Sequence, residues 1–282
     1  MSLIKIAQDT LAAIGAGKYT APSGKTVSIS AAVSKSIKGS LLYGPDWLVG
    51  ILGDTNQSPT IEVTKESSLE AAYRLKDLDP CLLNFASAKH PGGGFLRGSS
   101  AQEESIARSS ALYHTLMEHP EFYGANNTAT TDIGLYQDYA IYSPRVPVIR
   151  DDHGLWLEDP YMVSVLTSPA PNRRAIFEKF EATCEPGREQ ARERSRLEGL
   201  IKNTIQTRIT QILSIMASHG HRSIILGAWG CGVFGNDPVD VAGAFKEALK
   251  QTLFFDNITF PIYDKQDSEV FVAFKEAFEQ RT

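Results

Sequence analysis

Residues 91–104, PGGGFLRGSSAQEE, place two adjacent glutamates shortly after three consecutive glycines. Glycines let a ligand approach the backbone closely and expose N–H groups to it. Carboxyl groups are the usual acids and bases of glycoside hydrolysis. Neither common phosphate fingerprint, GxGxxG or GxxxxGK[ST], occurs here. The stretch therefore suggests a ligand-binding loop followed by acid–base chemistry, although three glycines alone would also fit a flexible loop.

Glu103 and Glu104 stand at the start of a predicted helix over residues 101–118. Ser100 to Glu103 has the spacing of a capping box, in which Ser100 is the N-cap and Glu103 reaches back. Glu104 lies one position beyond that box, and a surface glutamate is its structural alternative. Adjacent helical residues point roughly 100° apart. The two carboxyls therefore cannot flank one glycosidic bond, and a glycosidase would use one of them as acid and then as base.

An acid at this place faces an electrostatic obstacle. A helix N-terminus favours an ionised carboxylate and lowers the pKa of a carboxyl there. A substrate diphosphate nearby would raise that pKa again, because like charges disfavour ionisation. We therefore expect the acidic pKa of the pH–rate profile to be higher in the enzyme–substrate complex than in the free enzyme.

A second glycine-rich loop, GAWGCGVFGNDP at 227–238, follows another apolar run. Asp237 suits an N-cap and Pro238 the first helical position. Backbone N–H groups of such a loop suit a diphosphate, which should meet the loop because acidic Asp237 opposes it at the helix tip. Phe234 is predicted to cover a ligand sugar or base, with a core position as the alternative. Cys231 could serve a cysteine hydrolase, but no histidine is obviously placed as its base.

The elements around these loops indicate an α/β fold. Strand-like runs cover 25–30, 47–52, 60–64, 81–87, 139–143, 162–168, 223–229 and 257–263, and helical patterns cover 3–17, 66–77, 101–118, 187–219, 238–252 and 267–280. Several strands are continuous apolar runs, which suits strands covered on both faces. We predict helices on both sides of a mixed sheet, with both glycine loops between a strand and a helix, where α/β sheets bind ligands. Residues 18–46 are predicted to be turn-rich, and the charged residues 185–208 are interpreted as a solvated helix face or an exposed insertion.

Composition narrows the function classes. The chain has 282 residues, of which 42% are hydrophobic, and a net charge of -5, so direct DNA binding is not expected. Three scattered cysteines, Cys81, Cys184 and Cys231, argue against a disulfide framework and favour a reducing compartment. His219 and His221 predict a turn rather than a metal site. With no apolar run of membrane-spanning length and no signal pattern, we expect a soluble, cytoplasmic monomer without membrane contact.

Several segments resemble a known family, the poly(ADP-ribose) glycohydrolases. GGG, seven residues and then QEE resembles their signature, and LNFASAKHPGGGF, IYSPRVPVIRDD, LGAWGCGVFGNDP and LAAIGAGKYTAPSGKTVSIS resemble the shorter microbial-type members. The resemblance covers most of the chain, least clearly 172–200, and Ser87 stands where animal relatives have the asparagine of FAN. The resemblance implies a three-layer macrodomain with a mixed central sheet between helices. It implies one domain over 1–282, made of a helical N-terminal extension at 1–46 and a macrodomain core at 47–282.

The resemblance also implies a reaction, namely hydrolysis of ribose–ribose bonds in poly(ADP-ribose), mainly from chain ends, with release of ADP-ribose. Glu104 matches the catalytic acid, and Glu103 its neighbour on the leaving ribose side. The implied substrate-binding residues are Gly92, Gly93, Gly94, Gln102, Ser87, Gly230, Cys231, Gly232, Val233, Phe234 and Gly235, and Gln102 would support the ribose and the glycine loop. The implied partner is ADP-ribose or its polymer on modified proteins, with no metal or other cofactor.

Two alternatives stay open. Many macrodomains only read ADP-ribose, and the same cleft could serve a hydrolase of a different mono-ADP-ribosyl bond. Asn172 follows a strand end and could contact adenine, but a turn residue is the favoured interpretation.

Overall fold

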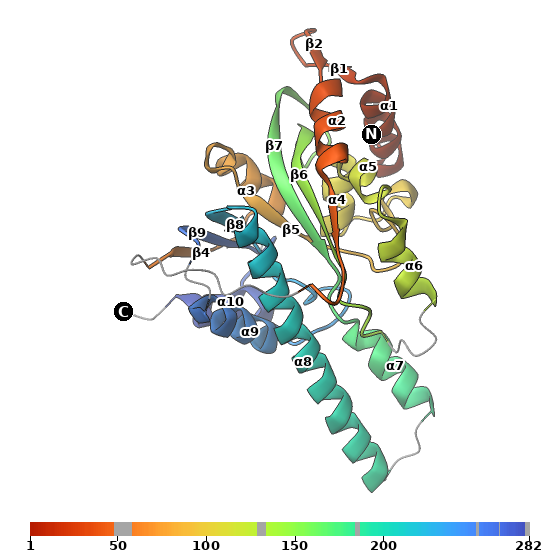
Figure 1. Cartoon of the computed structure of the whole chain (residues 1–282), viewed down its shortest axis with the longest axis vertical. Helices are drawn as coiled ribbons and strands as arrows, with labels where there is room; N and C mark the ends of the chain where they lie inside the picture. Colours follow the sequence, from red (N-terminus) through yellow and green to blue (C-terminus); the bar gives the residue numbers. More distant parts are fainter. Residues whose placement is uncertain (48–57, 129–133, 184–186, 252–253, 265, 280–282) are drawn as a thin grey trace.

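The computed structural model describes residues 1–47, 58–128, 134–183, 187–251, 254–264 and 266–279 (Figure 1). Within them, a seven-stranded sheet has the order β3-β6-β7-β5-β8-β9-β4. Its strands are β3 Leu41–Tyr43, β4 Thr60–Thr64, β5 Cys81–Phe85, β6 Ala140–Arg150, β7 Trp156–Ser168, β8 Ser223–Ile225 and β9 Asn257–Pro261, and β1 Lys18–Thr20 and β2 Thr26–Ser28 form a separate hairpin. β6 is antiparallel to β3 and β7, whereas the other pairings are parallel, so the sheet is mixed as predicted.

Helices cover both faces of this sheet, as Figure 1 shows. One apolar core lies under α7 Arg173–Thr183, α8 Arg188–Ser218, α9 Pro238–Gln251 and α10 Glu269–Phe278. The other lies under α1 Leu3–Ala16, α2 Ser30–Gly39, α3 Ser68–Arg74, α4 Gln102–Ser109, α5 Leu112–Leu116 and α6 Pro120–Thr128. Short 3₁₀ turns, η1 Lys76–Leu78 and η2 Phe95–Arg97, complete the described elements. The predicted three-layer arrangement is confirmed.

The central strands are apolar because both of their faces are covered. In β5, Leu82 belongs to one core and Leu83 to the other, and both are fully buried. Side chains alternate across a strand, so a strand between two helical layers needs an apolar residue at every position. Asn84 breaks this run as a fully buried polar residue, which makes it a candidate for a specific role at the end of the strand.

Several predicted boundaries differ from the structure. The helix predicted over 101–118 is two helices, because Ser110 has an extended backbone and forms a β-bridge with Val148. The Ser110 hydroxyl donates to Ile106 O and accepts from Leu112 N at this break. The strands predicted at 139–143 and 162–168 belong to a longer β6–β7 hairpin with register shifts between Ser143 and Val146. The strand predicted over 223–229 ends at Ile225, shortly before Gly227 turns left-handed with φ +75°.

Helices α2, α6 and α7 were not predicted. Residues 18–46 contain α2, which begins after Ile29 without any side-chain cap, so the usual start signal is missing. The strand predicted at 47–52 lies outside the described residues beyond Trp47. The N-terminal helix continues through Gly15 and ends at Gly17, which has φ +68°.

The charged helix α8 has two different halves. Its first residues are mostly exposed, with ion pairs such as Arg196–Glu193, as the solvated-face interpretation predicts. That interpretation is wrong for Arg208, which is 1% exposed and pairs with Asp138 at 2.6 Å. The predicted turn after α8 is confirmed, because His219 ends the helix and Gly220 is left-handed.

Candidate active site

The loops that carry the glycines meet at one edge of the sheet. β5 runs parallel to β7 and β8, so the carboxyl ends of all three strands lie together. Trp229 donates from its indole Nε1 to Ser168 O at 2.9 Å, which ties the segment after β8 to the end of β7. Gly227 lies against β5, since a Cβ there would be 2.8 Å from the Phe85 ring. This edge is the expected ligand position of an α/β sheet.

The first glycine loop turns its bare backbone toward the two glutamates. Gly92 and Gly93 have φ of +66° and +59°, a region that favours glycine. A Cβ on Gly93 would lie 3.0 Å from Glu104 Cδ and 3.2 Å from Glu103 Oε2. Glycine at 93 therefore lets both carboxyl groups occupy the space that a side chain would fill.

Glu104 is held by the loop that it faces. Its side chain is largely buried, and Oε1 accepts a hydrogen bond from Gly94 N at 2.8 Å. The backbone N–H thus fixes the direction of the carboxyl group, and the absence of a side chain at Gly93 leaves space beside it. A fixed carboxyl at the mouth of a glycine loop can transfer a proton to a group bound on that loop.

Glu103 points into the sheet edge, and the capping-box interpretation is wrong. The N-cap of α4 is Ala101, which has no side-chain cap bond. Glu103 is 3% exposed, and its carboxyl accepts from Ser87 N at 2.7 Å and from Asn84 Nδ2 at 3.2 Å. The partners of the Glu103 carboxyl are therefore donors at the end of β5, and not the backbone at the N-terminus of its own helix.

Burial changes the ionisation of Glu103. Loss of solvent raises its pKa to about 8, and nearby Glu104 acts in the same direction. Hydrogen bonds from Ser87 N and the Asn84 side chain work against this increase. Glu103 is therefore largely protonated at neutral pH, so the adjacent carboxyls need not both carry a charge.

Gln102 attaches α4 to the end of β5. Its Oε1 accepts from Phe85 N at 2.8 Å, and its Nε2 donates to Leu83 O at 2.8 Å and to Ser68 Oγ at 3.1 Å. β8 pairs with β5 only as far as Leu82, and the side-chain amide bonds the backbone of β5 beyond that point. These contacts give Gln102 a framework role.

Ser87 serves the shape of the loop in the structure. Its hydroxyl accepts from Lys89 N and His90 N, at 3.3 and 3.1 Å. Asn84 was missed by the sequence analysis and lies beside Glu103 and Thr167. A single amide inside the apolar run CLLNF is the signal that could have found it, because buried amides need specific partners.

The second glycine loop is locked to the segment after β7. Gly230 has φ +78°, and a Cβ there would lie 2.5 Å from Ala170 Cβ. Asn236 is 3% exposed and donates to Pro171 O at 2.8 Å and to Gly230 O at 3.0 Å. The predicted helix start is confirmed, since α9 begins at Pro238 and Asp237 Oδ1 accepts from Val239 N at 2.9 Å.

The tip of this loop is open. A Cβ on Gly232 would meet no atom within 4 Å, and Val233 is 68% exposed. Phe234 is half-buried against the core, with its ring centroid 6.1 Å from that of Tyr136, and Gly235 N donates to Gly232 O at 3.0 Å. Exposed backbone at the tip suits an anionic ligand.

Two further residues have structural explanations. Burial raises the pKa of the Cys231 thiol to about 12, which disfavours the thiolate that a cysteine nucleophile needs. Asn172 accepts from Ala175 N at 3.0 Å through Oδ1 and so caps α7, which agrees with the turn interpretation. In the described ranges, no three His, Cys, Asp or Glu side chains are grouped to hold a metal ion. None of the described helices has the length and apolar character needed to cross a membrane.

Fold and site together define an α/β glycoside hydrolase of the macrodomain type. The profile of the family described as microbial-type PARG, catalytic domain, matches residues 7–151. The chain belongs to this family. A comparison with curated protein sequences gave no match.

Solved structures of poly(ADP-ribose) glycohydrolases are similar over most of the chain. One from Thermomonospora curvata is 41% identical, with a TM-score of 0.85, and the match covers 98% of this chain and 99% of that one. Another from the same organism, bound to the inhibitor ADP-HPD, is 42% identical over 98% and 99% of the two chains, with a TM-score of 0.84. A Deinococcus radiodurans structure in complex with ADP-ribose is 34% identical over 88% and 96%, with a TM-score of 0.74.

Proposed function

We propose that this chain is a poly(ADP-ribose) glycohydrolase that hydrolyses ribose–ribose O-glycosidic bonds through Glu104. The observation that carries the proposal is the placement of Glu104, whose carboxyl is held by Gly94 N–H beside the side-chain-free backbone of Gly93. A protein that only binds ADP-ribose has no need of a carboxyl fixed in this position. Family membership and similarity to glycohydrolases in complex with ADP-ribose support the same substrate.

The proposed reaction uses one carboxyl twice. The terminal ribose lies on the backbone of Gly92–Gly94, and the diphosphate lies on the open loop Gly230–Gly235. Glu104 donates its proton to the leaving ribose oxygen as the bond to the anomeric carbon breaks, and an oxocarbenium-like centre forms. Glu104 then takes a proton from water, whose oxygen bonds to that carbon. The substrate diphosphate helps to stabilise the cation.

Glu103 is proposed to act beside this centre by holding the leaving ribose side. This role is supported by the hydrogen bonds that Glu103 accepts from Ser87 N and Asn84 Nδ2, which hold its carboxyl at the end of β5. A pKa raised to about 8 keeps it largely neutral at pH 7. A neutral carboxyl can donate a hydrogen bond to a sugar hydroxyl, which a carboxylate cannot do.

The test is release of ADP-ribose from poly(ADP-ribosyl)ated protein by the wild type and by E104Q. Glutamine keeps the size of the side chain and removes its proton chemistry. We expect rapid release by the wild type and near-complete loss in E104Q, with binding of ADP-ribose retained in calorimetry. E189Q is the matched control, because Glu189 also lies in the first turn of a helix but is exposed.

Other outcomes point to different functions. Binding without release by the wild type would indicate a reader of ADP-ribose. Release from mono-ADP-ribosylated protein but not from polymer would indicate hydrolysis of a different bond. Full activity of E104Q would remove Glu104 from the mechanism.

We further propose that the chain acts mainly from polymer ends, as a cytoplasmic monomer that forms one domain. Product analysis tests the first point, because action at chain ends yields ADP-ribose early, whereas internal cleavage yields oligomers first. Sedimentation at micromolar concentration tests the monomer.

A further inference from the structure

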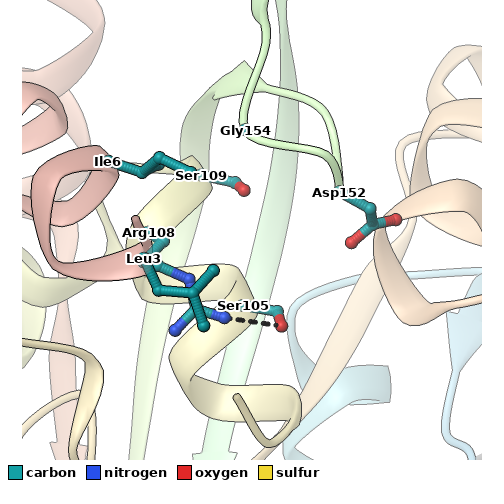
Figure 2. Close-up of a pocket in the computed structure, with 7 residues that line it drawn as sticks. All are labelled: Leu3, Ile6, Ser105, Arg108, Ser109, Asp152 and Gly154. Carbon is teal, nitrogen blue, oxygen red and sulfur yellow. Dashed lines mark hydrogen bonds between the residues drawn. The ribbon is translucent and has the colours of Figure 1, made fainter. Parts of the chain in front are cut away.

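Arg108 is a buried cation with no assigned role. It lies four residues after Glu104 on α4 and is 6% exposed. Its guanidinium donates to Ser99 O, and to Ser105 Oγ at 3.2 Å, and burial lowers its pKa. Figure 2 shows Arg108 and Ser105, joined by a hydrogen bond, among the residues that line a small cavity together with Leu3, Ile6 and Gly154. Burying a charge is costly, and both hydrogen bonds go to neutral groups, although the nearby carboxyls of Glu104 and Asp152 favour the charged form.

The Ser99 carbonyl, which accepts from Arg108, lies at the end of the glycine loop. Ser99 N and Arg97 N both donate to Gly94 O, at 3.2 and 2.8 Å. The side chain of Ser99 also lies directly against Gly94, leaving no space for a Cβ there. Residues 94–99 therefore form a closed turn, and a movement of Ser99 would be transmitted to Gly94.

The other end of the same turn is held by Glu104, which accepts from Gly94 N at 2.8 Å. Helix α4 is thus hydrogen-bonded to the turn at two points, through Glu104 to Gly94 and through Arg108 to Ser99. Positions i and i+4 lie on one face of a helix, so both side chains can reach the same loop. The loop in return orients Glu104, because Gly94 N–H can hold the carboxyl only where Ser99 keeps the turn closed.

From this arrangement we propose that Arg108 is a positioning residue for glycoside hydrolysis, which fixes residues 94–99 and thereby the direction of the Glu104 carboxyl. This inference rests on the proposed function. Arginine suits the role because its planar group presents several donors in fixed directions, so it can bond Ser99 O and Ser105 Oγ at once. Lysine offers a charge without that geometry.

The N-terminal helix α1 is hydrogen-bonded to the backbone of Arg108. Thr10 of α1 donates to the carbonyl of Arg108 at 2.7 Å, and Thr10 Oγ1 accepts from Arg150 Nε at 2.9 Å. The Arg150 guanidinium lies 3.3 Å over the Trp156 ring. Residues 1–46 are thereby joined to the catalytic helix, and Arg108 lies where the loop, α4 and α1 meet.

The experiment compares the wild type with R108M, R108K and S110A. Ser110 is 1% exposed at the end of the same helix and bonds Ile106 O rather than the loop, so S110A controls for damage to α4. We expect R108M to lower kcat on polymer by about 10- to 100-fold, the range produced by a misplacement of about 1 Å. In R108M the Kd for ADP-ribose should change by less than about threefold. The kcat of R108K should lie between those of R108M and the wild type, and S110A should keep kcat within about twofold of the wild type.

Hydrogen exchange at the Gly94 amide supplies a readout that does not depend on activity. In R108M and R108K this amide should exchange at least about tenfold faster than in the wild type, since its bond to Glu104 opens more often. An unchanged Gly94 exchange rate, or a kcat loss no larger than that of S110A, would overturn the proposal. Failure of the wild type to release ADP-ribose would instead overturn the proposed function, and Gly94 exchange would still decide the role of Arg108. If R108M does not fold, R108K decides both readouts.

Discussion

Replacing Gly93 by alanine should disable the site while leaving the fold intact. The new Cβ would lie 3.0 Å from Glu104 Cδ and 3.2 Å from Glu103 Oε2, and closer still to Glu104 Oε1. These neighbours are the ends of side chains, so the substitution can be accommodated by moving a carboxyl. The carboxyl that must move is the proposed acid.

The structure sets the size of both effects. To restore an ordinary contact, the nearest oxygen of Glu104 must move by about 1 Å, and such a displacement can cost about 100-fold in rate. Gly93 also has φ +59°. An alanine in the left-handed region costs about 1–2 kcal/mol, which lowers Tm by only about 2–4 °C for a domain of this size. Activity should therefore fall far more than stability.

The assay measures kcat for ADP-ribose release and Tm for G93A beside G24A. Gly24 has φ +87°, and a Cβ there would meet nothing within 4 Å, so G24A carries the backbone strain without the contact. We expect similar small losses of Tm in both variants and a loss of kcat in G93A alone. If G93A kept kcat within about threefold, or if G24A lost as much, the reasoning from the contact at Gly93 would be refuted.

Three further predictions concern Glu103, Cys231 and Gln102. The folded-state pKa of Glu103 is about 8 against an ordinary 4.5, so the folded state retains a proton that the unfolded chain releases. Stability from this group is present below about pH 4.5 and is lost as the pH rises to about 8, so the Tm of the wild type should fall relative to E103Q over that range, and parallel curves would contradict this. C231A should keep kcat within about twofold because the half-buried thiol, whose pKa is raised to about 12, is not ionised at pH 7; a loss above about tenfold would give Cys231 a direct role. Q102A leaves Phe85 N and Leu83 O without their partner and should lower the free energy of unfolding by about 2 kcal/mol in urea denaturation. A loss under about 0.5 kcal/mol would mean that other groups satisfy the end of β5.

The predicted helix starts and strand positions were most accurate where local chemistry decides them. TIEVT is a strand with the predicted bounds, and CLLNF is the first part of the strand predicted over 81–87, because β-branched and apolar residues suit a pleated strand. Asp237 and Pro238 mark the start of α9 through a bond to Val239 N, only two residues away. Helix α2 escaped prediction because it has no side-chain N-cap.

The local interpretation failed for side chains whose partners lie far along the chain. Glu103 has the spacing of a capping box, yet it bonds Ser87 and Asn84, which are 16 and 19 residues away. Arg208 belongs to a charged helix, yet it bonds Asp138, 70 residues away. A buried polar group is stabilised by whichever partner the fold brings to it, and sequence spacing does not reveal that partner.

The sequence by itself determined the glycine loops, the carboxyl pair and the apolar strands that precede them, because glycine conformation and strand burial depend on residue type and near neighbours. Only the tertiary structure decided which carboxyl accepts from the Gly94 amide, which carboxyl is buried with a raised pKa, and that Arg108 bonds Ser99 at the far end of the same loop. These properties follow from distances between β5, α4 and α1. Those distances arise when the two cores close over the sheet, and no local pattern records them.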